Sequence, residues 1–149
     1  MYPEMMVFPM REELRSVGVD ELRTAEEVDR ALASQPGTAM VVVNSICGCA
    51  AGRMRPAVRA ALRHTSRPQK VFSVFAGQDR EATERARSYF TGHLPSSPSI
   101  ALLRDGKLVH MLDRSDIEHR DSADIATELT RVFDQFCGDS ELAPSSTAN

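Results

Sequence analysis

Two short apolar runs rich in β-branched residues stand out from a chain that otherwise has helical spacing. Residues 39–44 read AMVVVN, a continuous run typical of a strand buried on both faces. Residues 71–76 read VFSVFA and predict a second strand of the same kind. Because helical segments flank and separate these strands, the pattern predicts an α/β domain.

The helical segments carry apolar residues three and four positions apart and begin at recognisable capping residues. A short amphipathic piece covers 12–17, and Thr24 to Glu27 forms a capping box ahead of the next helix. Asp79 is placed to cap a further helix, and Gly138 to follow the last one. The apolar faces comprise Val28, Ala31 and Leu32; Val58, Ala61 and Leu62; Ala82, Ala86, Tyr89 and Phe90; and Ile125, Leu129, Val132, Phe133 and Phe136.

A hairpin is predicted between the last two helices. Residues 99–103 and 108–112 are short apolar strands, and Asp105-Gly106 between them suits a primed two-residue turn. The order helix, strand, helix, strand, helix, hairpin, helix resembles the thioredoxin-like fold, a three-layer α/β arrangement with a mixed central sheet flanked by helices. We expect one such domain over 1–138, with an N-terminal helical extension, and a flexible acidic tail over 139–149.

Composition narrows the class of partner. The chain has 149 residues, 42% of them hydrophobic, and a formal net charge of -3 with no Lys/Arg run, which argues against nucleic-acid binding. Residues 1–10 lack the basic start of a signal peptide, and no apolar run approaches the roughly 20 residues that span a bilayer. A cytoplasmic protein without a membrane partner is therefore expected.

The candidate chemistry lies in Cys47-Gly48-Cys49, which follows the first predicted strand and opens a helix. Cys47 would lie beside the unsatisfied N–H groups and the positive dipole end of that helix, where a thiolate is stabilised. Since the thiolate is the attacking species in thiol exchange, a lowered pKa at this position predicts a redox-active cysteine. Arg53 and Arg55 can add positive potential there and take part in substrate binding, or can simply be solvated.

One residue between the cysteines makes a Cys47–Cys49 disulfide a small, strained ring, which the glycine eases. Strain raises the reduction potential, so the dithiol is a weaker reductant than a relaxed Cys-x-x-Cys pair. This profile suits removal of one thiol cap from a client protein. Cys47 would attack the mixed disulfide, and Cys49 or a second small thiol would resolve the product.

Three alternatives for the cysteines remain open. They can be packed apolar residues. They can also bind zinc or an iron-sulfur centre together with Cys137 and one of the four histidines, in a module that binds or delivers metal. The histidines are His64, His93, His110 and His119. A thioredoxin-fold interaction protein with vestigial cysteines is a third reading, and Cys137 itself is either a core residue or an accessory thiol.

Pro98 stands one residue before the predicted hairpin, in a Ser-Ser-Pro-Ser loop. The thioredoxin fold places a cis-proline there, facing the active cysteine. The interval from Pro98 to Asp105-Gly106 resembles the interval between that proline and the hairpin turn in thioredoxins. We therefore predict a cis peptide bond and a place for Pro98 in substrate binding.

From about Tyr2 to Cys137 the chain resembles the bacilliredoxin family, formerly a family of unknown function. The resemblance rests on a set of motifs rather than on Cys-Gly-Cys alone. These are Tyr2-Pro3-Glu4, Pro9-Met10-Arg11-Glu12-Glu13-Leu14, Asn44-Ser45-Ile46-Cys47-Gly48-Cys49-Ala50-Ala51-Gly52, Arg55-Pro56, Phe75-Ala76-Gly77-Gln78-Asp79 and Ser96-Ser97-Pro98-Ser99-Ile100-Ala101-Leu102.

The resemblance implies a thioredoxin-like fold and removal of bacillithiol, or a similar small thiol, from mixed disulfides on client proteins. It implies Cys47 as nucleophile and Cys49 as resolver, no cofactor other than the small thiol, and weak disulfide reductase or isomerase activity. Met54 departs from the smaller residue expected in the motif helix and would alter access. The apolar segment 5–8 packs on the core or on a second subunit, so a homodimer is possible.

Overall fold

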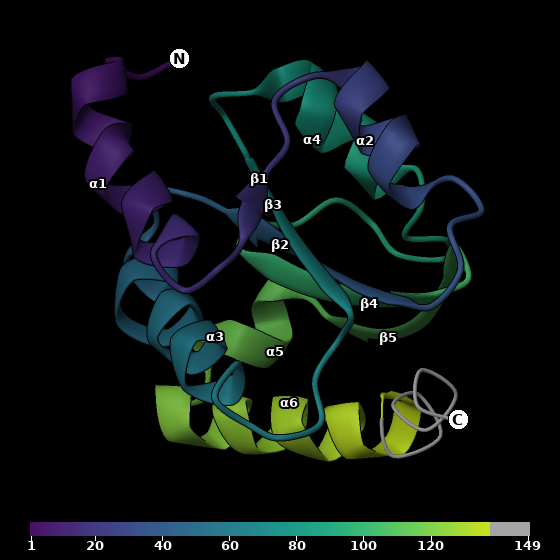
Figure 1. Ribbon diagram of the computed structural model, residues 1–149. Coiled ribbons are helices and arrows are strands. Elements are labelled where there is room, and N and C mark those ends of the chain that lie inside the picture. The colour runs from purple at the N-terminus through teal and green to yellow at the C-terminus, as the bar shows by residue number, and fades with distance from the viewer. Residues whose placement is uncertain (138–149) are drawn as a thin grey trace.

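The computed structural model describes residues 1–137, and the predicted Gly138 cap and the tail at 139–149 lie outside the described residues. A central five-stranded sheet with strand order β1-β3-β2-β4-β5 is covered by helices on both faces (Figure 1). The strands are β1 (Asp20–Glu21), β2 (Thr38–Asn44), β3 (Lys70–Phe75), β4 (Ser99–Arg104) and β5 (Lys107–Leu112). The predicted three-layer arrangement with a mixed sheet is confirmed.

The helices are α1 (Glu4–Arg15), α2 (Ala25–Leu32), α3 (Arg55–Ala61), α4 (Arg80–Arg87), α5 (Arg114–Glu118) and α6 (Ser122–Phe136). A π-helical turn, η1 (Ala50–Met54), leads into α3. Helices α2 and α4 lie on one face of the sheet, whereas α3, α5 and α6 lie on the other (Figure 1). Strand β1, turn η1 and helix α5 were not predicted, because each has too few residues to leave a periodic pattern.

Strand β2 explains why the core has two halves. Met40 and Val42 face the α3 and α6 side, while Val41 and Val43 face the α2 and α4 side. All four side chains are buried, which fits the continuous apolar run and the alternation of side chains along a strand. Strand β2 pairs in parallel with β3 and antiparallel with β4, so it is the centre of the sheet.

The hairpin turn is confirmed. Strands β4 and β5 pair antiparallel, and Asp105 (φ +53°) and Gly106 (φ +82°) are both left-handed, as a type I′ turn requires. Gly106 also packs tightly, because a Cβ there would lie 2.9 Å from the backbone nitrogen of Ser34. This glycine therefore serves both the turn and its contact with the end of α2.

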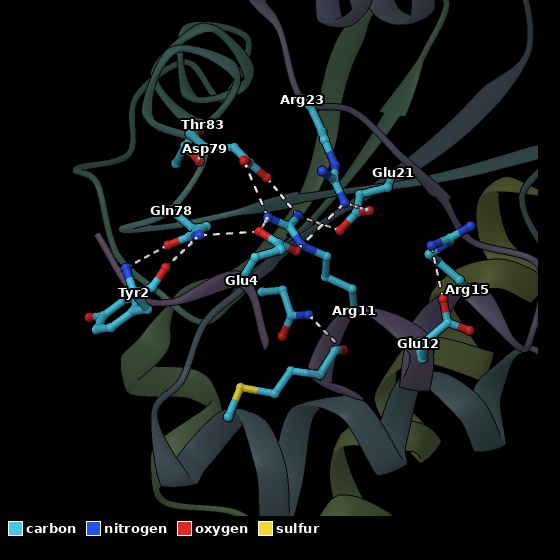
Figure 2. A network of polar contacts seen from close by, with 12 residues as sticks. Tyr2, Glu4, Arg11, Glu12, Arg15, Glu21, Arg23, Gln78, Asp79 and Thr83 are labelled. Atoms are coloured by element: carbon cyan, nitrogen blue, oxygen red, sulfur yellow. Dashed lines mark hydrogen bonds and ion pairs between the residues drawn. The ribbon is translucent and has the colours of Figure 1, made fainter. Parts of the chain in front are cut away.

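The N-terminal helix is held by a buried arginine (Figure 2). The Arg11 guanidinium, 2% exposed as a residue, forms ion pairs with Glu4 at 2.7 Å, Glu21 at 2.6 Å and Asp79 at 2.7 Å. Its charge is therefore compensated by three carboxylates from three segments. Asp79 precedes α4 as predicted, but its side chain does not cap that helix because the carboxylate binds Arg11 instead.

Helix α1 begins earlier than the predicted piece at 12–17 and contains the whole segment 5–8. Val7 is fully buried in the core, whereas Met5, Met6 and Phe8 are 84%, 44% and 52% exposed. Only one residue of this segment therefore packs on the core of the chain. Near the start of the helix, Gln78 binds the backbone of Tyr2 through both ends of its amide (Figure 2).

Candidate active site

The cysteine motif begins where β2 ends at Asn44. The Ser45 hydroxyl accepts a hydrogen bond from the Cys47 N–H at 3.2 Å and so turns the chain out of the strand. The Cys47 carbonyl then accepts from the N–H groups of Ala50 at 2.9 Å and Ala51 at 3.2 Å. These bonds start the helical segment directly after Cys47, as the motif predicts, and they place its side chain beside the amino end of the segment.

The Cys47 sulfur lies at hydrogen-bond distance from the next backbone donor. Its Sγ accepts from the Cys49 N–H at 3.3 Å. That bond is the main cause that lowers the pKa of Cys47, and burial partly opposes it. The Cys49 thiol, the charge of Arg114 and the N–H of Ala50 lower the pKa of Cys47 further. Cys47 is therefore the thiol of the pair that ionises first.

The pKa of Cys49 shifts in the opposite direction. Burial raises it most, and both the hydrogen bond to Cys47 and the negative charge of the Cys47 thiolate raise it further. The Glu118 carboxylate adds to the rise, whereas Arg114 opposes it. The pKa values of the two cysteines are thus shifted in opposite directions within one small site, which is the difference that thiol exchange needs between an attacking and a resolving thiol.

Arg114 is the positive side chain that acts on both thiols, and the sequence reasoning did not find it. It begins α5, donates to the Ser97 carbonyl at 3.2 Å through Nη1, and pairs with Glu118 at 3.0 Å through Nε. The available signal was the pattern Asp113-x-x-Asp116, which forms a capping box in the structure and marks the start of α5. Its nearness to Cys47 could not be read from that pattern.

Pro98 lies at the same edge of the sheet. The Ser97–Pro98 peptide bond is cis, as predicted. Because Val43 pairs with Ser99 across β2 and β4, Pro98 lies beside the end of β2 from which the cysteine motif follows. The loop before it is held by Arg114 at Ser97 and by the Ser99 hydroxyl, which donates to the Ser96 carbonyl at 3.0 Å.

Arg55 is buried, which excludes the alternative that its side chain is simply solvated. It is 2% exposed, and its Nη1 donates to Asn44 Oδ1 at 2.9 Å and to the Ser45 carbonyl at 2.9 Å. Its Nε donates to Glu13 of α1, and Asn44 Nδ2 donates to the Met10 carbonyl at 3.1 Å. Arg55 therefore fixes the end of β2 against α1, three residues before Cys47.

Arg53 lies away from this network. Its Nη1 donates to the Arg120 carbonyl at 2.6 Å, which joins η1 to the segment between α5 and α6. The substrate contacts expected for Arg53, Arg55 and Pro98 stay predictions. Met54, between the two arginines, is fully buried in the core beside α3 and α6, so it acts in packing and not at the entrance of the site.

The ligand set required by the metal-site alternative is not assembled in the described part of the chain. Within residues 1–137, no group of three or more His, Cys, Asp and Glu side chains could hold a metal ion. Cys137 is fully buried in the core formed with α3 and α6, as the structural interpretation of this residue expected.

No helix in residues 1–137 is long and apolar enough to cross a membrane.

Comparison with solved structures identifies the fold. A thioredoxin from Malassezia sympodialis superposes with a TM-score of 0.57, at 10% identity over 80% of this chain and 91% of that one. A thioredoxin variant from Halobacterium salinarum gives 0.56, at 16% identity over 81% of this chain and 92% of that one. At such low identity the likeness shows the fold alone, and it agrees with the predicted thioredoxin-like class.

Sequence comparison identifies the family. A family model described as Disulphide isomerase matches residues 2–137. A bacilliredoxin from Koribacter versatilis is 60% identical over 93% of this chain and 95% of its own, and one from Salinibacter ruber is 51% identical over 94% and 84%. A bacilliredoxin from Staphylococcus haemolyticus is 47% identical over 92% and 94%. The resemblance read from the motifs is confirmed, and the chain belongs to the bacilliredoxin family.

Proposed function

We propose that this protein is a thiol-disulfide oxidoreductase that removes bacillithiol, or a similar small thiol, from mixed disulfides on client proteins. The opposite pKa shifts of the two thiols carry the proposal, because Cys47 is the more acidic thiol and Cys49 the less acidic one. A nucleophile must be ionised to attack, and a resolving thiol must stay protonated until it is needed. The bacilliredoxin names of the relatives support the choice of capping thiol.

In the first step the Cys47 thiolate attacks the sulfur of the small thiol in the client mixed disulfide. The bond between client and cap breaks, a bond between Cys47 and the cap forms, and the client leaves as a thiolate that takes a proton from water. No net oxidation occurs, because one disulfide replaces another. The client therefore regains its thiol without any cofactor.

In the second step Cys49 attacks the Cys47 sulfur. Once Cys47 is capped, its negative charge and its hydrogen bond to Cys49 no longer raise the pKa of Cys49, so this thiol ionises more easily than in the free enzyme. Attack releases the small thiol and forms a Cys47–Cys49 disulfide, which a thiol reductant returns to the dithiol by supplying two electrons. A second small thiol can instead attack the cap directly.

The test is mass spectrometry of the protein mixed with a client that carries bacillithiol on one cysteine. We expect Cys49→Ala to accumulate the small thiol on Cys47 and Cys47→Ala to leave the client capped. If both variants clear the client as fast as the wild type, the transfer mechanism is wrong. Metal analysis after anaerobic purification completes the experiment, because a stoichiometric metal lost in Cys47→Ser would favour the metal-binding alternative.

The description of the matching family model favours disulfide isomerase activity as a second candidate. Isomerisation would use the same Cys47 attack, but on a protein disulfide instead of a small-thiol cap. Refolding of a client with scrambled disulfides measures it, and a rate equal to the decapping rate would make isomerisation the better description. We also propose a cytoplasmic location, since a reducing compartment keeps both cysteines as thiols.

A further inference from the structure

We propose that Arg87 and Arg80 form a carboxylate-binding site beside the loop that leads to Pro98. Both arginines line a cavity of about 230 Å³ on one face of α4, together with Gly77, Thr83 and Glu84. The positions 80, 83, 84 and 87 recur at helical spacing, so these side chains lie along one side of the helix. The site is separate from the two thiols and from Arg114.

The state of Arg87 is the first observation. Its Nε is buried and has no hydrogen-bond partner among the described residues. Within residues 1–137 it is the one buried side-chain nitrogen or oxygen atom without such a partner. No carboxylate of residues 1–137 lies within ion-pair distance of its guanidinium. Burial lowers the pKa of Arg87, and only the more distant charge of Glu84 opposes that shift. A desolvated cation with an unused donor is costly unless an anion binds it.

Arg85, a neighbouring arginine on α4, has the carboxylate partner that Arg87 lacks in the described part of the chain. Arg85 is exposed and binds both oxygens of Asp29, each at 2.8 Å. Arg87 makes one hydrogen bond within residues 1–137, and its acceptor is neutral: Nη2 donates to the Ser96 carbonyl at 3.2 Å. That bond leaves Nη1 without an acceptor among residues 1–137, and because Nε itself has almost no accessible surface, a carboxylate in the cavity would reach the guanidinium through its Nη groups.

The position of the cavity is the second observation. Gly77 follows β3, and β3 runs parallel to β2, so the carboxyl ends of both strands lie at the edge of the sheet that carries the cysteine motif. Ser96, which Arg87 contacts, lies two residues before Pro98. A carboxylate bound to Arg87 would therefore belong to a molecule at the margin of the active site. Two sources share this chemistry, a carboxylate of the small-thiol cap and an acidic side chain of the client.

The binding test uses acetate as the probe, at constant ionic strength, and follows backbone amides near Gly77 and Thr83 by heteronuclear NMR. We expect saturable shifts in the wild type and in Arg85→Gln. In Arg87→Gln the affinity should fall roughly 10-fold or more, which corresponds to the loss of one charge-assisted hydrogen bond. Arg80→Gln removes an exposed side chain and should weaken binding less. Absence of saturation in the wild type, or equal affinity in Arg87→Gln, overturns the proposal.

A kinetic test separates the two sources, and only this test rests on the proposed transfer function. It compares kcat/KM for peptide mixed disulfides with a carboxylated or a neutral cap, and with acidic or neutral residues beside the capped cysteine. A loss in Arg87→Gln that is confined to carboxylated caps assigns the cap, and one confined to acidic peptides assigns the client. An equal loss for all four substrates overturns the assignment of a carboxylate at this site. Failure of every enzyme form to decap any peptide would instead refute the transfer function and leave the acetate result unaffected.

Discussion

Replacement of Arg55 by methionine tests whether the active-site strand end depends on a buried cation. Methionine keeps much of the side-chain volume in the core but removes every donor. Arg55→Met deprives Asn44 and the Ser45 carbonyl of a donor that now lies at 2.9 Å from each, in a place where Arg55 itself is 2% exposed. The loss therefore falls mainly on groups that water cannot readily reach.

The magnitude follows from the number of contacts and their burial. A hydrogen bond to a charged group contributes about 1.5–3 kcal/mol, and breaking a buried ion pair costs about 3–5 kcal/mol. Glu13 is 36% exposed and keeps its ion pair with Arg59, so the ion-pair part of the cost is reduced. We expect Arg55→Met to lower the free energy of unfolding by about 3 kcal/mol, within the range set by these two contributions.

Arg59→Met is the matched control, because Arg59 binds the other oxygen of the same Glu13 at 2.7 Å but is 40% exposed. An exposed pair contributes about 0–1 kcal/mol, so this variant should unfold almost as the wild type does. Urea denaturation under reducing conditions measures both. The reaction rate of Cys47 with a neutral alkylating reagent, recorded on the folded variants, shows whether the loop has moved.

Equal destabilisation by Arg55→Met and Arg59→Met would refute the reasoning, because burial would then not decide the contribution of each arginine. A destabilised Arg55→Met with unchanged Cys47 reactivity across pH would refute only the second part, that Arg55 positions the cysteine loop. Arg55→Lys keeps the positive charge but lacks the planar guanidinium. Compared with Arg55→Met, it should recover part of the stability but little of the geometry by which Arg55 binds both Asn44 and the Ser45 carbonyl.

Three other changes have expected outcomes. Arg114→Gln should raise the pKa of Cys47, because the positive charge that favours its thiolate is removed. In a pH titration the thiolate absorbance should therefore appear at higher pH than in the wild type. This difference in pKa should shrink at about 1 M salt, where the screening length is about 3 Å. Arg11→Met leaves three carboxylates without their shared cation and should cost about 3–5 kcal/mol in urea denaturation, whereas a loss below about 1 kcal/mol would mean that the network contributes little. Gly106→Ala should destabilise more than Gly18→Ala in thermal melts, since both residues have positive φ but only the Cβ at Gly106 meets backbone at 2.9 Å; equal melting temperatures would contradict the steric argument.

The local pattern of apolar and polar residues was sufficient to predict the elements that bury a face along their whole length. The run at 39–44 had to be a central strand, because both of its faces are apolar and only the middle of a covered sheet buries both. The turn at Asp105-Gly106 was equally local, since its backbone conformation is one that these two residues readily adopt. The strand-to-helix step placed Cys47 at a helical amino end for the same reason, because it follows from the order of neighbouring segments.

Only the tertiary structure decided which charges surround that cysteine and which of them are buried. Arg114 lies 67 residues after Cys47 along the chain yet acts on its thiolate, and Glu13 of α1 reaches Arg55 from 42 residues earlier in the sequence. Asp79 looked like a helix cap because capping is local, but Arg11 competes for its carboxylate from 68 positions away. Ion pairs between distant segments leave no periodic trace in a sequence, since each needs only two residues that the packed layers bring together. The sequence alone therefore determined the fold and the place of the cysteine pair at a helical amino end, while the packing of α5 beside that end added the charges of Arg114 and Glu118 that act on the thiols.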